Sequence, residues 1–262
     1  METAATSGEQ AVMAVTESDV QQTYEVFYRV PRVGQLRLSD GGGPFGFDIH
    51  LALLVHQLID MLGCDAICET GSFVGDTTHY LAARYPDLPV YSCDIDPRHV
   101  AVTRRRLARH GNATVKCCDS PRLVAEVAGR HARPLCFLDA HWGAQWPLVQ
   151  ELELLATRAP SGGAVAVVHD FDIGHPRFSY DSYGGRDCGP GLLAELAHPP
   201  AVYFTPRPDG PWPLPCLQTG RRAGAAVIAF GLDDTPLRDH PLLEVRAVPA
   251  PAPAPVPEPT AR

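Results

Sequence analysis

Short runs of apolar residues alternate with longer amphipathic stretches through the middle of the chain. The runs that we predict to be strands are 65–70, 89–95, 113–118, 134–139 and 163–170. The intervening stretches have a helical period, and the helices expected there are 76–85, 97–110, 120–130 and 145–157. Strands that alternate with helices in this way form a parallel sheet with crossover helices, so the pattern predicts an α/β fold.

The pattern changes after residue 170. A short helix at 191–197 is followed by two further apolar runs, 201–205 and 225–232. The proline-rich loop between these runs is too short to hold a crossover helix, so we expect the two strands to be antiparallel. The predicted architecture is a Rossmann-like sheet of seven strands, mostly parallel with an antiparallel last strand, and with helices on both faces.

The N-terminal part precedes this repeat. Residues 1–8 should be disordered, whereas 9–30 have an irregular helical period that suits packing on the face of a domain. The glycine-rich run Ser39–Phe47 serves either as a mobile lid or as a plain linker, and it leads into a helix at 48–62 that ends at Gly63. The predicted segments are therefore a helical N-terminal segment with the lid or linker, 1–47, a single domain, 48–247, and a disordered Pro/Ala-rich tail, 248–262.

Composition limits the kind of ligand. The 262 residues are 45% hydrophobic, which is enough for one large core. The net charge of −8 and the pI near 5.7 would on average repel the phosphates of a nucleic acid. We therefore expect a small-molecule substrate and no nucleic-acid partner. The N-terminal segment leaves open a homodimer formed through it.

Cysteine usage indicates the compartment. The eight cysteines form no paired C-x-x-C sets, several lie in strand-like runs, and this is typical of buried free thiols in a reducing cytosol. The N-terminus lacks a signal-peptide pattern, and no uninterrupted apolar stretch approaches membrane length. We therefore expect a cytoplasmic protein without a membrane partner.

The segment 66–78, A-I-C-E-T-G-S-F-V-G-D-T-T, is the most informative part of the chain. An apolar run ends in Glu69, a turn bracketed by Gly71 and Gly75 follows, and the first amides of the next helix would face a ligand. The spacing E-x-G-x-x-x-G differs from the G-x-G-x-x-G of dinucleotide folds. It resembles the first motif of class I S-adenosylmethionine (SAM) methyltransferases. This resemblance covers about 48–232 and implies that the loop holds the methionine part of SAM.

Later strand ends carry further acids for a cofactor site, because ligands of open α/β sheets lie beyond the carboxyl ends of the strands. Glu69 could accept a hydrogen bond from the ligand ammonium, and Asp94 could accept two from ribose hydroxyls. The resemblance puts Asp119 near the adenine amino group, although Asp119 or Ser120 could merely cap the next helix. Asp96 more simply caps the helix that starts at 97. The expected cofactor-binding residues are Glu69, Gly71, Ser72, Gly75, Thr77, Thr78, Asp94, Asp119, Ser120 and Asp139.

The fourth and fifth strands, which are neighbours in the predicted sheet, end in Asp139 and Asp170. Acids at adjacent strand ends repel each other unless a cation or protons intervene. With Asp172 or a histidine they form an oxygen-rich set suited to Mg²⁺ or another divalent cation. Here the chain resembles the metal-dependent O-methyltransferases of the catechol and macrocin type, which implies a cation that binds substrate oxygens and lowers the pKa of a hydroxyl. The expected metal ligands are Asp139, Asp170 and Asp172.

Two features leave the catalytic roles open. The catechol type has a lysine base after its D-H-W motif, whereas this chain has an additional Ala140, and Gly143 stands where the lysine would fall. His141 and His169 become the candidate bases, because imidazole titrates near neutrality, and the predicted catalytic set is completed by Asp139. Alternatively, the strand-end acids orient loops by accepting from backbone amides, and the histidines are packing residues.

The loop 174–190 is rich in aromatic, glycine and hydroxyl residues and should be a lid or specificity element. Its tyrosines can stack on a substrate. Arg186 could pair with a substrate anion or form an ordinary surface contact. The residues expected to contact the substrate are His141, Trp142, Tyr180, Tyr183 and Arg186.

These patterns predict a SAM-dependent methyltransferase that methylates a hydroxyl oxygen of a small polar molecule with the help of a divalent cation. One alternative is a metal-independent N- or O-methyltransferase with a histidine base. Remoter alternatives are an NAD-dependent oxidoreductase, disfavoured because the second glycine of its fingerprint is absent, and a SAM-binding protein without catalysis. The alanine-, arginine- and proline-rich composition is associated with natural-product tailoring such as antibiotic biosynthesis.

Overall fold

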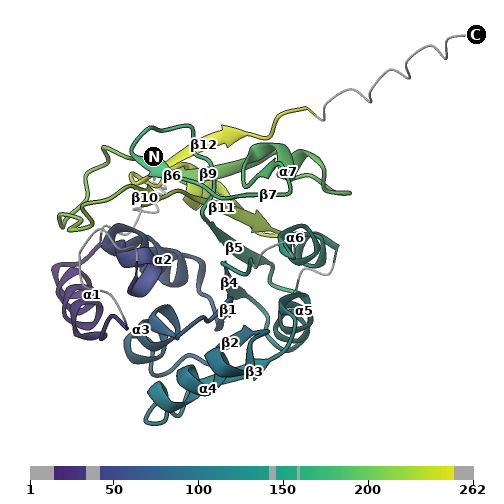
Figure 1. The fold of residues 1–262 in the computed structure, drawn as a ribbon. Helices are drawn as coiled ribbons and strands as arrows, with labels where there is room; N and C mark the ends of the chain where they lie inside the picture. The colour runs from purple at the N-terminus through teal and green to yellow at the C-terminus, as the bar shows by residue number, and fades with distance from the viewer. Residues whose placement is uncertain (1–14, 34–41, 142–145, 158–159, 251–262) are drawn as a thin grey trace, which may run out of the picture.

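A large mixed sheet forms the centre of the protein (Figure 1). The computed structural model describes residues 15–33, 42–141, 146–157 and 160–250. The strands of the sheet are β1 (Ala66–Thr70), β2 (Val90–Asp94), β3 (Ala113–Cys117), β4 (Pro134–Leu138), β5 (Ala164–His169), β9 (Val202–Pro206), β11 (Ala225–Phe230) and β12 (Leu243–Ala247). Their order across the sheet is β12-β9-β11-β5-β4-β1-β2-β3.

The first five strands form the parallel half of the sheet. β1 pairs in parallel with β2 and β4, β2 pairs with β3, and β4 pairs with β5. The order 3-2-1-4-5 is that of a doubly wound, Rossmann-like sheet. β11 lies between β5 and β9 and is antiparallel to both. The antiparallel pairing predicted for the two late apolar runs is therefore confirmed.

The prediction of seven strands is wrong, because β12 adds an eighth strand at the edge, antiparallel to β9. Within β12 only Leu243 is buried. An edge strand pairs on one side alone and can stay largely solvated, so few of its positions need to be apolar. Its sequence, LEVRA, therefore lacks the apolar run by which the other strands were recognised.

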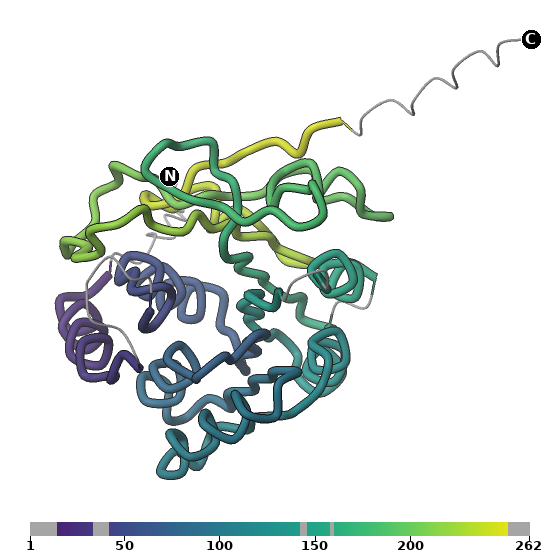
Figure 2. Tube along the Cα trace, viewed as in Figure 1, coloured from purple at the N-terminus to yellow at the C-terminus, as the bar shows by residue number. Residues whose placement is uncertain are grey.

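Helices cover both faces of the sheet, as the alternating pattern predicted (Figures 1 and 2). One face carries α1 (Glu17–Arg29), the short 3₁₀ turn η2 (Pro44–Phe47), α2 (Ile49–Leu62) and α3 (Asp76–Arg84). The other face carries α5 (Ser120–Arg130), α6 (Leu148–Thr157) and α7 (Pro190–Ala194). Beside α3, α4 (Pro97–Arg106) packs against β3, and α8 (Thr235–Arg238) precedes β12. The central strands β1, β4, β5 and β11 are thus buried on both faces, which explains their near-continuous apolar sequences.

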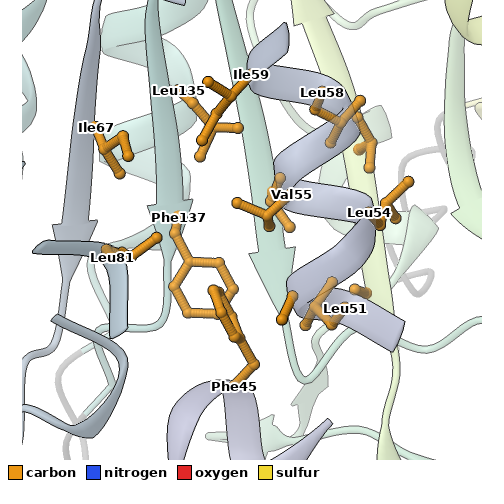
Figure 3. Close-up of a cluster of buried hydrophobic side chains, with 14 of the residues drawn as sticks. Phe45, Leu51, Leu54, Val55, Leu58, Ile59, Ile67, Leu81, Leu135 and Phe137 are labelled. Atoms are coloured by element: carbon orange, nitrogen blue, oxygen red, sulfur yellow. The ribbon is translucent and has the colours of Figure 1, made fainter. Parts of the chain in front are cut away.

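The helix α2 anchors one face of the core. Figure 3 shows side chains of α2 beside those of the strands. The labelled residues of α2 are Leu51, Leu54, Val55, Leu58 and Ile59, and those of β1 and β4 are Ile67, Leu135 and Phe137. Burying one leucine completely stabilises the fold by about 1.5–3 kcal/mol. The helix begins where Asp48 accepts hydrogen bonds from the backbone N–H groups of His50 (2.9 Å) and Leu51 (3.2 Å). It ends at Gly63 in the left-handed conformation, as predicted for 48–62.

Two small sheets lie in segments that we predicted to be loops, 174–190 and the proline-rich loop between the two late apolar runs. β6 (Phe178–Ser179) pairs with β10 (Arg222–Ala223), and β7 (Ser182–Tyr183) pairs with β8 (Arg186–Asp187) in a tight hairpin. Strands of two residues are too short to show a period in the sequence. The hairpin gives the predicted specificity loop a defined shape.

None of the helices that the structure describes combines the length and the hydropathy that a membrane span requires. The segments predicted to be disordered, residues 1–8 and most of 248–262, lie outside the described residues, as do 39–41 of the predicted lid or linker.

Candidate active site

A cavity of about 1080 Å³ lies at the carboxyl ends of β1, β2, β4 and β5. Parallel strands end at the same edge of a sheet, so residues far apart in sequence meet there. Among the residues predicted from the sequence, those that line the cavity are Glu69, Gly71, Ser72, Thr77, Asp94, Asp119, Ser120, Asp139, His141, His169, Asp170 and Tyr183. The residues predicted for the cofactor and those predicted for catalysis therefore share one cavity.

Two glycines of the β1–α3 loop are required by close approaches. Gly71 has a φ of +80°, and a Cβ atom there would lie 2.3 Å from the carbonyl oxygen of Asp139. Gly75 has a φ of +81°, and a Cβ atom there would lie 2.6 Å from Cγ2 of Thr103. Any other side chain would clash and would also disfavour the left-handed backbone. The loop can therefore lie close to β4 and α4 only because both residues are glycines.

Glu69, at the end of β1, is 2% exposed. Its Oε2 accepts a hydrogen bond from Ser92 Oγ at 2.6 Å and another from Thr78 Oγ1. Burial raises the pKa of Glu69 to about 7, and the two hydroxyl hydrogen bonds oppose this rise. Thr78, which we predicted to bind the cofactor, is not in the cavity wall: it is fully buried behind Glu69, because its hydroxyl turns toward this carboxylate.

Asp94, at the end of β2, has both oxygens bound to backbone amides. Its Oδ2 accepts from the N–H of Phe73 at 2.9 Å, and its Oδ1 accepts from the N–H of Asp96 at 2.8 Å. His99 Nδ1 lies 3.3 Å from Oδ1. These contacts hold the carboxylate at the cavity wall. Asp96 itself caps α4 by accepting from the N–H of Arg98 at 2.8 Å, which confirms the predicted cap.

Asp119 combines two roles that the sequence left as alternatives. It is the N-cap residue of α5 and accepts from the N–H of Ser120 at 3.1 Å, and it also lines the cavity. Capping therefore does not keep this carboxylate away from a ligand. On the opposite loop, Ser72 is 4% exposed, and its hydroxyl has no hydrogen-bond partner among the described residues.

The glycine-rich segment contributes to the wall of the cavity. The N–H of Gly43 donates to Asp76 Oδ2 at 2.9 Å, and the N–H of Phe45 donates to Thr77 Oγ1 at 3.0 Å. Phe45 is 1% exposed and contacts the rings of Tyr80 and Phe137. Residues 42–47 are therefore attached to the start of α3, beside the predicted cofactor loop.

Two acids and two histidines gather at the ends of β4 and β5. His169 Nδ1 lies 3.1 Å from Asp139 Oδ1 and 3.3 Å from Asp170 Oδ2. His141 Nε2 lies 3.7 Å and 3.5 Å from the same two oxygens. Asp139, His141 and Asp170 each offer one possible ligand atom, and these three atoms lie within 4.8 Å of one another. Asp170 has a φ of +52°, a strained conformation of the kind that persists at functional sites.

The cluster needs a positive charge between its acids. Burial lowers the pKa of His141, but the neighbouring carboxylates of Asp139 and Asp170 outweigh burial and raise this pKa to about 10. Burial also acts against the charged form of His169, yet the same two carboxylates raise its pKa well above the usual value. Burial raises the pKa of Asp170, and the two histidines reverse that effect and lower it. In the free protein, protons on the histidines therefore balance the carboxylates.

Other predicted residues lie elsewhere. The side chain of Asp172 accepts from the N–H of Gly174 at 2.8 Å and is not part of the cluster, because this bond holds it in its own turn. Tyr180 is 39% exposed and does not line the cavity. Arg186 pairs with Glu195 at the surface. This is the ordinary surface contact that the sequence left open as the alternative to binding a substrate anion. Trp142 lies outside the described residues.

Some residues in or beside the cavity were not predicted. Trp146 lines it, and Asp181 contacts both His141 and Tyr183. The spacing of Asp181 and Tyr183, two residues apart, could have indicated a shared strand face. Glu151 of α6 is fully buried near the cluster, and burial raises its pKa to about 7. A single acid in an amphipathic helix gives no sign of this burial.

Comparisons with known proteins concern the fold. No family model and no curated protein sequence matches this chain. A solved structure from Klebsiella pneumoniae, provisionally assigned as an O-methyltransferase, is 16% identical, with a TM-score of 0.47 over 82% of this chain and 90% of that one. A methyltransferase from Geobacter sulfurreducens is 15% identical, with a TM-score of 0.42 over 69% of this chain and 77% of that one.

A fibrillarin pre-rRNA processing protein from Methanococcus jannaschii is 18% identical, with a TM-score of 0.32 over 40% of this chain. The chain spans about half the length of the fibrillarin structures it matches, 44% in this case and 49% in another. At identities and TM-scores this low, these likenesses carry no conclusion about activity. The observed strand order, with antiparallel β11 beside β5, is the Rossmann-like, mostly parallel arrangement that the sequence predicted.

Proposed function

We propose that this protein is a SAM-dependent methyltransferase that methylates a hydroxyl oxygen of a small polar molecule with the help of a divalent cation. One observation carries the proposal: Glu69 and Asp94 line the same cavity as the acid and histidine cluster around Asp139. Glu69 and Asp94 have the chemistry to bind an adenosyl ligand that carries an ammonium group. The cluster around Asp139 has the chemistry to bind a cation. Methyl donor and activated oxygen would then share one cavity.

On the cofactor side, each group matches one part of SAM. Ionised Glu69 would pair with the ammonium, and Asp94 would accept hydrogen bonds from the ribose hydroxyls. The hydroxyl of Ser72 and the first amides of α3 suit the carboxylate of the methionine part. Asp119 would accept from the adenine amino group.

The donor set of the cluster fits a divalent cation. Carboxylate oxygens of Asp139 and Asp170 suit Mg²⁺ and Mn²⁺, and first-row metals also accept an imidazole nitrogen. A divalent cation bound there would lower the pKa of an acceptor hydroxyl and orient its oxygen. Asp172 lies outside the cluster, so we propose His141 as the third ligand in its place.

The residues of the chain would arrange the reaction. His169 donates from Nδ1 toward both strand-end carboxylates and fixes their orientation. Trp146 and Tyr183 supply aromatic walls for the acceptor. The acceptor oxygen attacks the methyl carbon in line, the carbon–sulfur bond breaks to leave a neutral thioether, and the hydroxyl proton passes to Asp139 or to water.

The metal-independent alternative requires a neutral histidine as base. With pKa values raised by the neighbouring acids, His141 and His169 are both protonated near neutrality and cannot accept a proton. A divalent cation would replace these protons, because it neutralises the same carboxylates. This electrostatic argument favours the cation-assisted reaction.

The test combines cation binding with turnover. Mn²⁺ binding is measured by electron paramagnetic resonance, and release of the demethylated cofactor is measured with a panel of hydroxylated acceptors. Asp139→Asn and Asp170→Asn should lose both, while the affinity for the demethylated cofactor stays within about threefold, since neither acid is proposed to carry the cofactor alone. The matched control is Asp209→Asn, which changes an acid that is 82% exposed.

Asp172→Asn decides between the two candidate third ligands. Retained Mn²⁺ binding in this variant supports His141, and lost binding supports the sequence-based choice of Asp172. Methyl transfer that is indifferent to both a chelator and Asp139→Asn would contradict the cation-assisted proposal.

A further inference from the structure

The hairpin of β7 and β8 brings two more residues to the proposed cation site. Gly184 and Gly185 have φ values of +59° and +78°, which close the two-residue turn. The N–H of Asp181, just before the hairpin, donates to the carbonyl oxygen of Asp170 at 3.0 Å. The hairpin is therefore attached to the strand end that carries a proposed ligand. From this position Tyr183 reaches Nδ1 of His141, on the side of the ring away from the strand-end acids.

The hydrogen bonds of Tyr183 have a defined direction. A phenol has one proton to donate, and an ionised carboxylate can only accept. Tyr183 Oη lies 2.6 Å from Asp181 Oδ2 and donates to it. The same Oη contacts His141 Nδ1, and because its proton is already donated, it can only accept there. Nδ1 of His141 must therefore carry a proton.

The second ring nitrogen of His141 faces acids. Nε2 lies 3.7 Å from Asp139 Oδ1, 3.5 Å from Asp170 Oδ2 and 3.4 Å from Asp181 Oδ2. These distances exceed the usual length of an N–H···O hydrogen bond. A neutral imidazole with its proton on Nδ1 has a lone pair on Nε2, which repels carboxylates but binds a cation that sits among them. The direction of one hydrogen bond thus decides whether His141 can be a ligand.

We propose that Asp181 and Tyr183 act as positioning residues that make His141 a cation ligand by fixing its proton on Nδ1. The inference rests on the proposed cation site, and it gives the two residues a role that acts through the His141 ring. Histidines that bind metals commonly donate their other N–H to an oxygen, and loss of that partner costs roughly 10–100-fold in metal affinity.

Tyr183→Phe is the sharpest variant, because it removes only the hydroxyl. The ring centroid of Tyr183 lies 4.9 Å from that of His141 and 5.2 Å from that of Trp146, and phenylalanine keeps both contacts. We expect Mn²⁺ affinity, measured by electron paramagnetic resonance, to fall roughly 10–100-fold. The affinity for the demethylated cofactor should change less than about twofold. The matched control, Tyr24→Phe on α1, should leave both unchanged, because this tyrosine is 46% exposed and does not line the cavity.

Variants of Asp181 separate hydrogen-bond direction from charge. Asp181→Asn keeps an oxygen that accepts from Tyr183 and should retain most of the Mn²⁺ affinity, whereas Asp181→Ala frees Tyr183 to donate to Nδ1 and should lose it. In the Mg²⁺-saturated protein, long-range ¹⁵N–¹H correlation should find the His141 proton on Nδ1.

The inference is overturned if Tyr183→Phe binds Mn²⁺ as the unmodified protein does, if both Asp181 variants lose equal affinity, or if the proton is found on Nε2. A different failure identifies the parent proposal as wrong: no Mn²⁺ binding by the unmodified protein would remove the cation site itself.

Discussion

Glu69 has a raised pKa of about 7 at the position proposed for the ammonium group of SAM. Burial is the main cause, and hydrogen bonds from Ser92 and Thr78 oppose it. An ammonium pairs with the ionised carboxylate only, so SAM binding should strengthen as the pH rises through this pKa. If only the ionised form binds, the affinity should rise roughly tenfold between about pH 6 and about pH 8. Titration calorimetry at both pH values measures this.

The control is Glu69→Gln, which should bind SAM weakly and without this pH dependence. The same group should affect stability. The folded protein keeps a proton that the unfolded chain releases above its usual pKa of 4.5, so stability falls as the pH rises from there to about 7. Glu69→Gln should therefore gain stability relative to the unmodified protein as the pH rises. A SAM affinity that falls with pH would contradict the assignment of Glu69.

Single residues could be predicted where the strand pattern fixed their place. Glu69, Asp94 and Asp119 each follow an apolar run, and parallel strands must end at one edge of the sheet. The role of Asp172 could not be judged in this way. Whether a residue past the strand turns inward depends on local backbone geometry, here the left-handed Asp170. A sequence without glycine at that position does not reveal such a conformation.

At the scale of the elements, the conformation of the β1–α3 loop depends on its close approach to Asp139, the residue that follows β4. Gly71→Ala would add a Cβ 2.3 Å from the carbonyl oxygen of Asp139 and would strain a φ of +80°. Strained backbone of this kind costs about 1–3 kcal/mol, and the clash adds to it. We expect lower stability in urea unfolding and at least roughly tenfold weaker SAM binding, because the displaced loop carries the proposed contacts to the methionine part.

Gly111→Ala is the matched control for that substitution. No heavy atom lies within 4 Å of the position of its added Cβ, and its φ is outside the left-handed region. It should leave stability and SAM binding close to those of the unmodified protein. Equal SAM affinity in Gly71→Ala would show that the loop does not contact the cofactor.

Elements with a clear period were predictable, and those held by tertiary contacts were not. α2 and α5 differ from the predicted helices by one residue or less, because caps such as Asp48 and Gly63 mark their ends. By contrast, the β7–β8 hairpin contains two residues per strand, and tertiary contacts such as the Asp181–Asp170 hydrogen bond hold it in place. Tyr183, which belongs to β7, was predicted from residue type and loop position alone.

At the scale of the whole molecule, strand order separates the two proposed functions. β1 lies between β2 and β4, so chain connections leave it in opposite directions, and a crevice opens at this reversal. The acids proposed for the cofactor come from the β1, β2 and β3 side, and those proposed for the cation come from β4 and β5. This division follows from the topology of the sheet and not from side-chain packing. The sequence analysis predicted most of these acids, but it placed Asp139 in both the cofactor set and the cation set.

The division predicts two additive effects on thermal stability. A ligand that binds the folded state alone stabilises it by about 2.7 kcal/mol at a concentration of about 100 times its Kd. For a chain of this size, that raises Tm by about 5–10 °C. SAM should produce such a shift in differential scanning fluorimetry and NAD should not, because the loop lacks the glycine spacing that binds a pyrophosphate.

Mn²⁺ should add a further shift in the unmodified protein but not in Asp139→Asn, while the SAM shift persists in that variant. Persistence follows from geometry: the cation would be lost at the end of β4, whereas the ribose and ammonium contacts come from Glu69 and Asp94 on β1 and β2. If Asp94→Ala instead kept the SAM shift, or if NAD stabilised the protein and SAM did not, the cavity would belong to another cofactor and the assignment of the two sides would fail together.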